Sequence, residues 1–337
     1  MLRTRITDLL GIEHPVLSGG MGSSTSADLV VAVSEAGGLG ILGATHLSSQ
    51  AIREQVAAIR SRTRRPFGVN LLIAFTDTAQ LEACLEARVP VLSTAWGDPV
   101  THARRAREAG VPLVHMVPTA AQAGNAARAG VTAVIAQGQE GGGHVGTVSS
   151  LPLLPAAVAA VAAATAPGAA PPPVIAAGGI ADGRGLVAAL ALGAEGVLLG
   201  TRFLATLEAP VPTAAKAAIC AASEADTVYT PIPDLVRRPG WLAIGAQSRA
   251  IRNQAIASWL GRETELAALD AGGLQRIAAQ WEEAQARDDV EGMVILAGQD
   301  CGLIHEVLPA GEVVRRVVAE AEAVLRRLSR PDLRSED

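Results

Sequence analysis

The strongest chemical signal in the sequence is a histidine that ends a run of glycines. His144 follows three consecutive glycines in the segment QGQEGGGHVG, which comes directly after the apolar run 133–136. An imidazole titrates near neutral pH, so it can remove or return a proton during catalysis. The glycines carry no side chain, which allows a flat cofactor to lie against the backbone. We therefore predict that His144 is catalytic and stands in a mobile, uncluttered loop, and that Gly142 and Gly143 contact the cofactor.

The other histidines carry weaker signals. His14, His46, His102 and His305 fall at the edges of predicted elements, and His115 is typical of a core histidine whose hydrogen bonds are satisfied. None of them has the spacing to another histidine or to a cysteine that a metal site requires. We therefore predict no metal centre.

Further glycines occur where other apolar runs end. Asn70 lies in the apolar segment GVNLL, where its amide would bind either a ligand edge or a neighbouring loop. The segments AAGGIADG and LLGTRF offer unhindered amides and one hydroxyl, the groups that bind a phosphate. No GxxxxGK[ST] loop occurs, and no GxGxxG opens a helix after a strand, so neither a P-loop nor a Rossmann site is expected. The segment SGGMG is either an ordinary glycine-rich turn or a backbone that a flat ligand can approach closely. The candidate contacts of a flat, phosphorylated cofactor here are Gly20, Met21, Gly22, Asn70, Gly178, Gly179, Gly200 and Thr201.

The elements that must position these residues alternate regularly along the chain. Short apolar runs predict strands at 16–19, 40–43, 68–73, 89–94, 113–117, 133–136, 174–177 and 196–200. Helical patterns lie between them at 27–36, 50–60, 79–87, 101–109, 120–129 and 184–192. Continuous apolar strands are typical of a parallel sheet that is buried on both faces. Eight such alternations predict an α/β fold, a closed (β/α)₈ TIM barrel, whose active site lies at the carboxyl ends of its strands.

The last third of the chain has a different pattern. Residues 224–300 contain Pro- and Gly-rich loops followed by helical patterns near 250–270 and 273–287. We predict that 1–223 and 301–328 form the barrel, that 224–300 form a small, mostly helical insertion near its mouth, and that 329–337 are a charged tail. The helix that completes the outer ring is expected at 310–328.

Composition excludes several classes of function. The net charge is −5 and aromatic residues make up only 2% of the chain, so no nucleic-acid partner is expected. The longest apolar run, 151–166, is too short to span a bilayer, and the N-terminus does not resemble a signal peptide. Cys84, Cys220 and Cys301 are far apart, as expected for free thiols. We therefore expect a cytoplasmic protein that acts on a small molecule, with a homodimer as its candidate assembly.

Several segments together resemble the nitronate monooxygenase family, formerly called 2-nitropropane dioxygenases, which is related to the flavin-dependent enoyl-acyl-carrier-protein reductases. They are PVLSGGMG, GVN, QGQEGGGHVG, AGGIADG with LLGTRF, and the late AGQDCGLIHEVLPAGEVV, so the likeness covers nearly the whole chain. Ser18, where Gln is frequent, and Gly141, where Ala is commoner, depart from the family pattern.

The resemblance implies one non-covalent FMN per barrel. Its phosphate would lie at Gly179, Gly200 and Thr201, and its ring at Gly20, Met21 and Gly22, with Asn70 near the polar edge of the ring. His144 would stand over the flavin, beside the α-carbon of the substrate, and Gln299 would reach the flavin from the late segment.

The leading hypothesis is oxidation of alkyl nitronates by FMN and O₂ to a carbonyl compound and nitrite, with His144 as the base if neutral nitroalkanes are accepted. The alternative is an NAD(P)H-dependent enoyl-thioester reductase on the same scaffold. A flavin-binding barrel without redox turnover is a third hypothesis. Because aromatic residues are scarce, we expect a pocket lined by Ala, Leu, Val and Ile that suits small aliphatic substrates.

Overall fold

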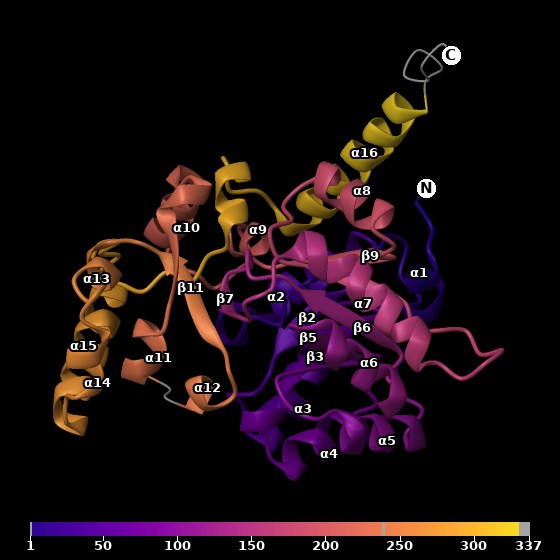
Figure 1. Ribbon diagram of the computed structural model, residues 1–337, viewed down its shortest axis with the longest axis horizontal. Helices are drawn as coiled ribbons and strands as arrows, with labels where there is room; N and C mark the ends of the chain where they lie inside the picture. Colours follow the sequence, from indigo (N-terminus) through magenta and orange to yellow (C-terminus); the bar gives the residue numbers. More distant parts are fainter. Residues whose placement is uncertain (1, 238–239, 330–337) are drawn as a thin grey trace.

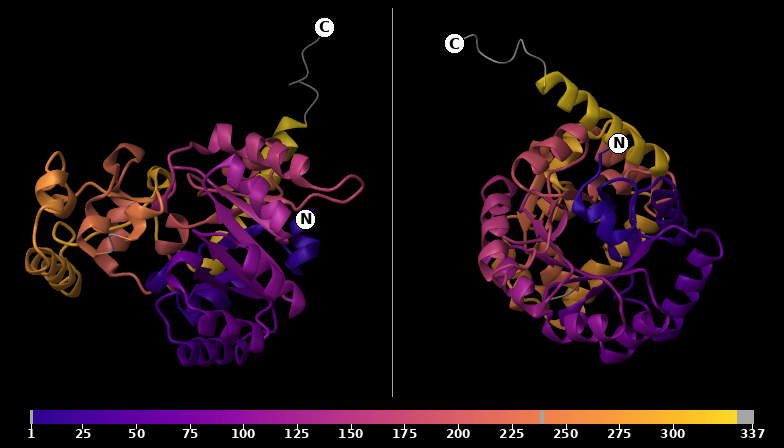
Figure 2. Two further views of the ribbon diagram at one scale, coloured as in Figure 1. Left: turned by 60° about the horizontal axis from the view of Figure 1, so that its bottom comes forward. Right: turned by 90° about the vertical axis from the view of Figure 1, so that its right-hand side faces the viewer.

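The computed structural model describes residues 2–237 and 240–329, and its main body is a parallel barrel. The hydrogen-bonded order of the strands is β1-β9-β8-β6-β5-β4-β3-β2, and a bridge between Leu17 and Leu39 joins the two ends of the sheet. Seen from one end, the helices form a ring around these strands (Figure 2). The predicted (β/α)₈ barrel is confirmed. Its strands are β1 (Val16–Ser18), β2 (Gly40–Gly43), β3 (Phe67–Leu72), β4 (Val91–Ala95), β5 (Leu113–Val117), β6 (Ala133–Gln137), β8 (Val174–Ala177) and β9 (Gly196–Leu199).

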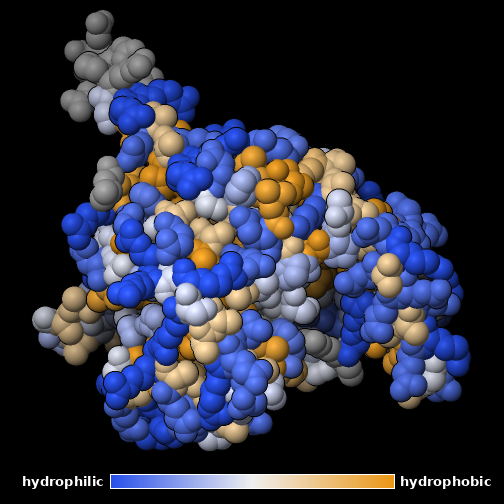
Figure 3. Space-filling view, turned by 180° about the vertical axis from the view of Figure 1, so that it is seen from behind, coloured by the Kyte–Doolittle hydropathy of each residue, from blue (hydrophilic) through white to orange (hydrophobic). Residues whose placement is uncertain are grey.

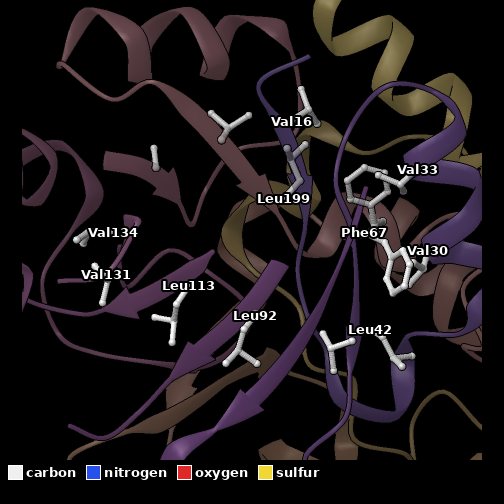
Figure 4. Packing of buried hydrophobic residues seen from close by; sticks show 14 of the residues in the cluster. Val16, Val30, Val33, Leu42, Phe67, Leu92, Leu113, Val131, Val134 and Leu199 are labelled. Carbon is white, nitrogen blue, oxygen red and sulfur yellow. The ribbon is translucent and has the colours of Figure 1, made fainter. Parts of the chain in front are cut away.

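The strands are continuous apolar runs because both of their faces are buried. Side chains such as Leu17, Ile135 and Ile175 point into the barrel, where they form one hydrophobic cluster. Alternate residues point outward against the helices and form the largest cluster, part of which Figure 4 shows. Full burial of one Val or Leu side chain stabilises the fold by about 1.5–3 kcal/mol. The labelled outward-facing strand residues include Val16, Leu42, Leu92, Leu113 and Val134.

The helices of the outer ring begin and end close to the predicted positions, within two residues for every predicted helix and strand of the barrel. Local signals explain their ends: the Ser26 side chain accepts a hydrogen bond from the N–H of Leu29, and Gly130 ends its helix in the left-handed conformation. The ring consists of α2 (Ala27–Glu35), α3 (Ser49–Arg60), α4 (Thr78–Glu86), α5 (Val100–Glu108), α6 (Ala120–Ala129), α7 (Ser150–Ala164), α8 (Gly183–Ala191) and α16 (Ala310–Leu328). The last of these packs against α8 and α2, while the short α1 (Arg5–Leu10) lies against the interior cluster.

A second group of elements lies at one end of the barrel (Figure 1). Its sheet contains β10 (Thr227–Thr230), β11 (Gln247–Ile251) and β7 (Gly143–Val145), all paired antiparallel, so a segment of the barrel chain contributes one strand. Its helices have their own core, which includes Ile232, Ile256, Leu266 and Trp281. The helices near this sheet are α10 (Thr213–Ala221), α11 (Ile232–Arg237), α12 (Gly240–Ala243), α13 (Gln254–Ala257), α14 (Glu263–Ala267) and α15 (Ala271–Ala286).

One expectation for this region is wrong. The helical pattern near 250–270 does not form one helix but the end of β11 and two short helices, α13 and α14. Gly261 lies between these two helices and adopts a left-handed φ of +76°. Before them, the side-chain amide of Asn253 donates to the backbone carbonyls of Val290 and Met293. The second pattern, 273–287, does form a helix, α15. The proposed boundaries of the insertion stay a prediction, and 330–337 of the predicted tail lie outside the described residues.

The surface is predominantly hydrophilic over the face that Figure 3 displays, with hydrophobic residues in small groups between charged ones. Among the helices of the described residues, none has the length and apolar composition that spanning a bilayer requires. Cys84, Cys220 and Cys301 are free thiols, and burial raises the pKa of Cys84 to about 12.

Candidate active site at the mouth of the barrel

A cavity of about 660 Å³ lies at the carboxyl ends of the barrel strands and is closed on one side by the appended elements. This volume is within the range of small-molecule and cofactor sites. The structure brings nearly all of the predicted site residues to this one cavity. Gly20, Met21, Gly22, Asn70, Gly142, Gly143, His144, Gly178, Gly179, Gly200 and Thr201 all line it. Gln299 is absent from its lining; the Gln299 N–H donates to the carbonyl of Glu140, 2.9 Å away.

His144 is held firmly, which contradicts the expectation of a mobile, uncluttered loop. It is the middle residue of β7, which pairs with β11, and it lies opposite Ser248. Its Nε2 atom is 2.6 Å from Oδ1 of Asp234, and its ring stacks on Trp241 with a centroid separation of 3.5 Å and an interplanar angle of 8°. The side chain retains 18% of its exposure and lines the cavity, so a ligand can still reach it.

Asp234 is the partner of His144 and is buried, with only 3% of its side chain exposed. It lies in the first turn of α11, and its Oδ2 atom accepts hydrogen bonds from the backbone N–H and the hydroxyl of Ser248, both at 3.0 Å. Sequence reasoning missed this residue because it lies 90 positions beyond His144, and no short motif links the two.

An aromatic cluster forms one wall of the cavity, which corrects the expectation of a purely aliphatic lining. Trp96 and Trp241 both line the cavity. The Trp241 ring packs against Phe75 at 4.6 Å and meets Trp96 edge-on at 5.8 Å, so residues from the barrel and from α12 join above the mouth. Trp96 has a left-handed φ of +55°, an uncommon conformation for a bulky residue and one that is frequent at functional sites.

The glycines that line the cavity differ in whether conformation and packing require a glycine. Gly178 has φ +93°, and a Cβ there would lie 2.7 Å from the Gly138 carbonyl oxygen, so both conformation and packing require glycine. Gly142 is also packed closely, since an added Cβ would clash with the backbone of Ala297 and Gly298. Gly200 differs: among the described residues, an added Cβ would have within 4 Å only the sulfur of Met21, which is itself a cavity residue, at 3.8 Å. Packing against the protein therefore does not explain Gly200, whereas a bound ligand would.

Polar groups at this end are well placed to bind a ligand. Thr201 begins the short helix α9 (Thr201–Leu204), in which the N–H groups of Phe203 and Leu204 donate to the Gly200 carbonyl. Its hydroxyl accepts a hydrogen bond from the Gly298 N–H at 2.9 Å, which connects strand β9 with the late segment. Asn70 has two partners, since its Oδ1 accepts from Ser93 at 3.0 Å and its amide approaches the Gly20 carbonyl at 3.4 Å. Asn70 therefore contacts a neighbouring loop and also lines the cavity.

Two further polar groups line the cavity, and sequence reasoning singled out neither. Within the described residues, Oε1 of Gln137 and Oδ1 of Asp300 are buried without a hydrogen-bond partner. Burial raises the pKa of Asp300 to about 7, against the opposing effects of a hydrogen bond with Thr201 and the charge of Arg202. A buried acceptor without a partner is costly, so these atoms indicate a ligand that supplies donors. Gln137, at the end of β6, could have been found from its strand-end position alone.

Two of the other histidines, His115 and His46, lie in the core and at the cavity, respectively. His115 is 3% exposed and its Nδ1 lies 2.9 Å from the Thr94 hydroxyl, and burial lowers its pKa to about 4, so it is a neutral core residue as predicted. His46, expected only at an element edge, lines the cavity.

Comparison with known proteins agrees with this arrangement. The family model described as nitronate monooxygenase matches residues 3–83 and 73–320. A probable nitronate monooxygenase of Staphylococcus saprophyticus is 30% identical over 97% of this chain and 99% of its own length. A carboxyl-CoA dehydrogenase of Mycobacterium tuberculosis, whose name describes a hydroxy-methyl-oxo-octahydroindene substrate, is 33% identical over 68% of this chain, and the match spans 63% of that relative.

Solved structures share the whole architecture. FabK from Thermotoga maritima is 35% identical, with a TM-score of 0.84 over 97% of this chain and 99% of that one. A nitroalkane oxidase from Streptomyces ansochromogenes is 30% identical, with a TM-score of 0.79 over 96% of this chain and 99% of that one. Because the family model covers most of the barrel and the cavity, and because full-length relatives share the fold, the chain belongs to the nitronate monooxygenase family of flavin-dependent oxidoreductases, which is related to the enoyl reductases.

Proposed function

We propose that the chain binds FMN and oxidises alkyl nitronates, and neutral nitroalkanes, with O₂ to a carbonyl compound and nitrite. One observation carries the proposal: the imidazole of His144 and the glycine-rich end at Gly178, Gly179, Gly200 and Thr201 line the same cavity. A phosphate anchor and a proton-transfer group therefore face one enclosed space. The similarity to a nitroalkane oxidase over nearly the full length of both chains supports this chemistry.

The residues present fit FMN. Gly179, Gly200 and Thr201 would hold its phosphate, and Gly20, Met21 and Gly22 would lie against its ring, because all six line the cavity and Gly22 and Gly200 leave space beside their backbone. The partnerless Oε1 of Gln137 would accept a hydrogen bond from an N–H of the flavin ring. When bound, FMN supplies the capacity to accept electrons from the nitronate and to pass them to O₂.

The chain's own residues handle binding and the proton. Trp96, Trp241 and the apolar side chains around them exclude water from the cavity, which strengthens polar interactions inside it. A neutral nitroalkane must lose its α-proton before it becomes electron-rich, and His144 is a basic group at the cavity wall that can take it. The proton moves from the α-carbon to the imidazole, and the electron pair it leaves is delocalised into the nitro group.

The His144→Asn variant tests this role. We expect turnover of neutral nitroalkanes to fall by about 10²–10⁴-fold, the usual contribution of a general base, while turnover of a preformed nitronate is largely kept. Steady-state oxygen consumption with each substrate measures both activities. Equal retention, or equal loss, of the two activities would remove proton abstraction by His144 from the mechanism.

A second function, NAD(P)H-dependent reduction of an enoyl thioester, is favoured by a specific feature. The apolar residues 293–296 of the late segment also line the cavity, and we infer that they would contact a thioester arm. FabK, at 35% identity, and the named CoA dehydrogenase are both among the similar proteins. Anaerobic mixing of the flavin-loaded protein with NADPH separates the two functions: rapid bleaching of the flavin supports the reductase, and bleaching that requires a nitronate supports the monooxygenase.

A further inference from the structure

We propose that Asp234 is a positioning residue that holds the His144 imidazole in a single tautomer, with its hydrogen on Nε2 and with Nδ1 left to accept the substrate proton. The catalytic part of this inference rests on the proposed function, while the tautomer itself does not. Asp234 also lines the cavity, but its side-chain oxygens bond to His144 and Ser248, so its role is exerted through His144.

The hydrogen-bond pattern around Asp234 fixes the direction of each bond. Oδ2 receives the backbone N–H of Ser248 at 3.0 Å, and an amide N–H can only donate, so this oxygen acts as an acceptor. The Ser248 hydroxyl lies at the same distance from the same oxygen, so Oδ2 accepts there as well. An ionised carboxylate can only accept hydrogen bonds, so we infer that the hydrogen lies on the nitrogen 2.6 Å from Oδ1, which is His144 Nε2. Because a neutral imidazole carries only one N–H, its Nδ1 is then the acceptor.

The surrounding structure prevents the imidazole from turning to another arrangement. The Trp241 ring lies parallel to it at 3.5 Å and closes one face. The pairing of β7 with β11 places His144 directly opposite Ser248, the residue that fixes Asp234. Trp241 and Asp234 both belong to the segment between β10 and β11, so that segment aligns the base of a barrel-derived strand. A His held on one nitrogen by a buried carboxylate is oriented for proton transfer at the other.

The charged and titratable neighbours have other contacts of their own. Arg249 points elsewhere, because its Nε donates to the Gln139 carbonyl and its Nη1 to the Thr227 hydroxyl. The guanidinium of Arg237, at the end of α11, lies over the Trp281 ring, 5.3 Å from its centroid. Burial raises the pKa of Tyr229, and the negative charge of Asp234 adds to this increase. The side-chain oxygens of Asp234 are therefore engaged by His144 and Ser248.

The test reads the tautomer directly. In protein labelled with ¹⁵N-histidine, two-bond ¹⁵N–¹H correlation spectra distinguish an Nε2–H from an Nδ1–H imidazole, and His144→Asn assigns the resonance. We expect His144 to be the Nε2–H form in the flavin-loaded wild-type protein, and Asp234→Asn to move it to a mixture of forms. An Nδ1–H ring at His144 in the wild type overturns the proposal, whether or not Asp234→Asn folds.

Activity provides the second readout. Asp234→Asn should lower kcat for neutral nitroalkanes by on the order of 10²-fold or more, leave the preformed nitronate nearly unaffected, and change the pH profile only for the former. Asp234→Glu should restore part of the loss, and Asp270→Asn, at the exposed N-cap of α15, should change nothing. A pH profile of Asp234→Asn that overlays the wild type overturns the positioning role. If the wild-type protein turns over neither substrate, the proposed function fails, and the spectra still decide the tautomer.

Discussion

Two glycines at the end of the cavity where we propose that the phosphate binds allow ligand binding to be separated from folding. Gly200 has an open side, where an added methyl group would meet only the Met21 sulfur at 3.8 Å among the described residues. Gly178 is enclosed, with φ +93° and the Gly138 carbonyl oxygen 2.7 Å from an added Cβ. Replacing each glycine by alanine adds the same methyl group in opposite surroundings. We expect Gly200→Ala to impair flavin binding alone and Gly178→Ala to impair folding.

The structure sets the size of both effects. In Gly178→Ala the left-handed backbone costs about 1–2 kcal/mol, and displacing a neighbouring backbone oxygen costs about 1–3 kcal/mol more. The free energy of unfolding should therefore fall by roughly 2–5 kcal/mol. In Gly200→Ala the apoprotein loses nothing of this kind and should stay within about 1 kcal/mol of the wild type. Its methyl group points into the cavity, so a phosphate there must shift, and a cost of about 1–3 kcal/mol raises the Kd for FMN about 5- to 150-fold.

Two measurements on the same preparations separate the effect of each substitution on folding from its effect on flavin binding. Urea unfolding of the apoproteins gives the free energy of unfolding, and quenching of FMN fluorescence on titration gives the Kd. Wild-type affinity for FMN in Gly200→Ala would refute the assignment of the phosphate to this loop. Wild-type stability in Gly178→Ala would refute the packing argument for the neighbouring glycine.

Two other expectations concern buried residues around the cavity. Trp241→Ala should lower the free energy of unfolding by about 3–5 kcal/mol, because the ring is 1% exposed and packs on three aromatic rings. Trp259→Ala, at a half-buried position, should lower it clearly less in the same urea titration. Equal losses in the two variants would contradict the importance of the aromatic cluster. Because the pKa of Asp300 is raised to about 7, its neutral form favours the folded state fully below about pH 4, and this stabilisation is lost as the pH rises through 7. As the pH rises from about 5 to about 8.5, the free energy of unfolding of the apoprotein should therefore fall less in Asp300→Asn than in the wild type. If this free energy changes with pH in parallel in the two proteins, Asp300 does not titrate in this range.

The sequence by itself determined the barrel and the positions of the cavity residues on it. Buried parallel strands need apolar side chains on both faces, so runs such as 113–117 and 174–177 were recognisable without any long-range information. Because parallel strands in a barrel all present their carboxyl ends at one face, His144, Gly179 and Gly200 could be assigned to a common site from their strand-end positions. The chemical properties of these residues follow from their types, which the sequence gives directly.

Only the tertiary structure decided what surrounds His144. Its strand β7 is three residues long and exists because it pairs with β11, more than a hundred positions later, so its own sequence looked like a flexible glycine loop. Asp234 and Trp241 reach it through the folding of a Pro-rich segment whose pattern predicts only loops. Likewise Gln299, which the family resemblance placed at the flavin, is absent from the cavity lining, and the neighbouring Asp300 lines the cavity instead. Contacts between segments far apart in the chain depend on side-chain packing in three dimensions, and no periodicity or spacing in one sequence records them.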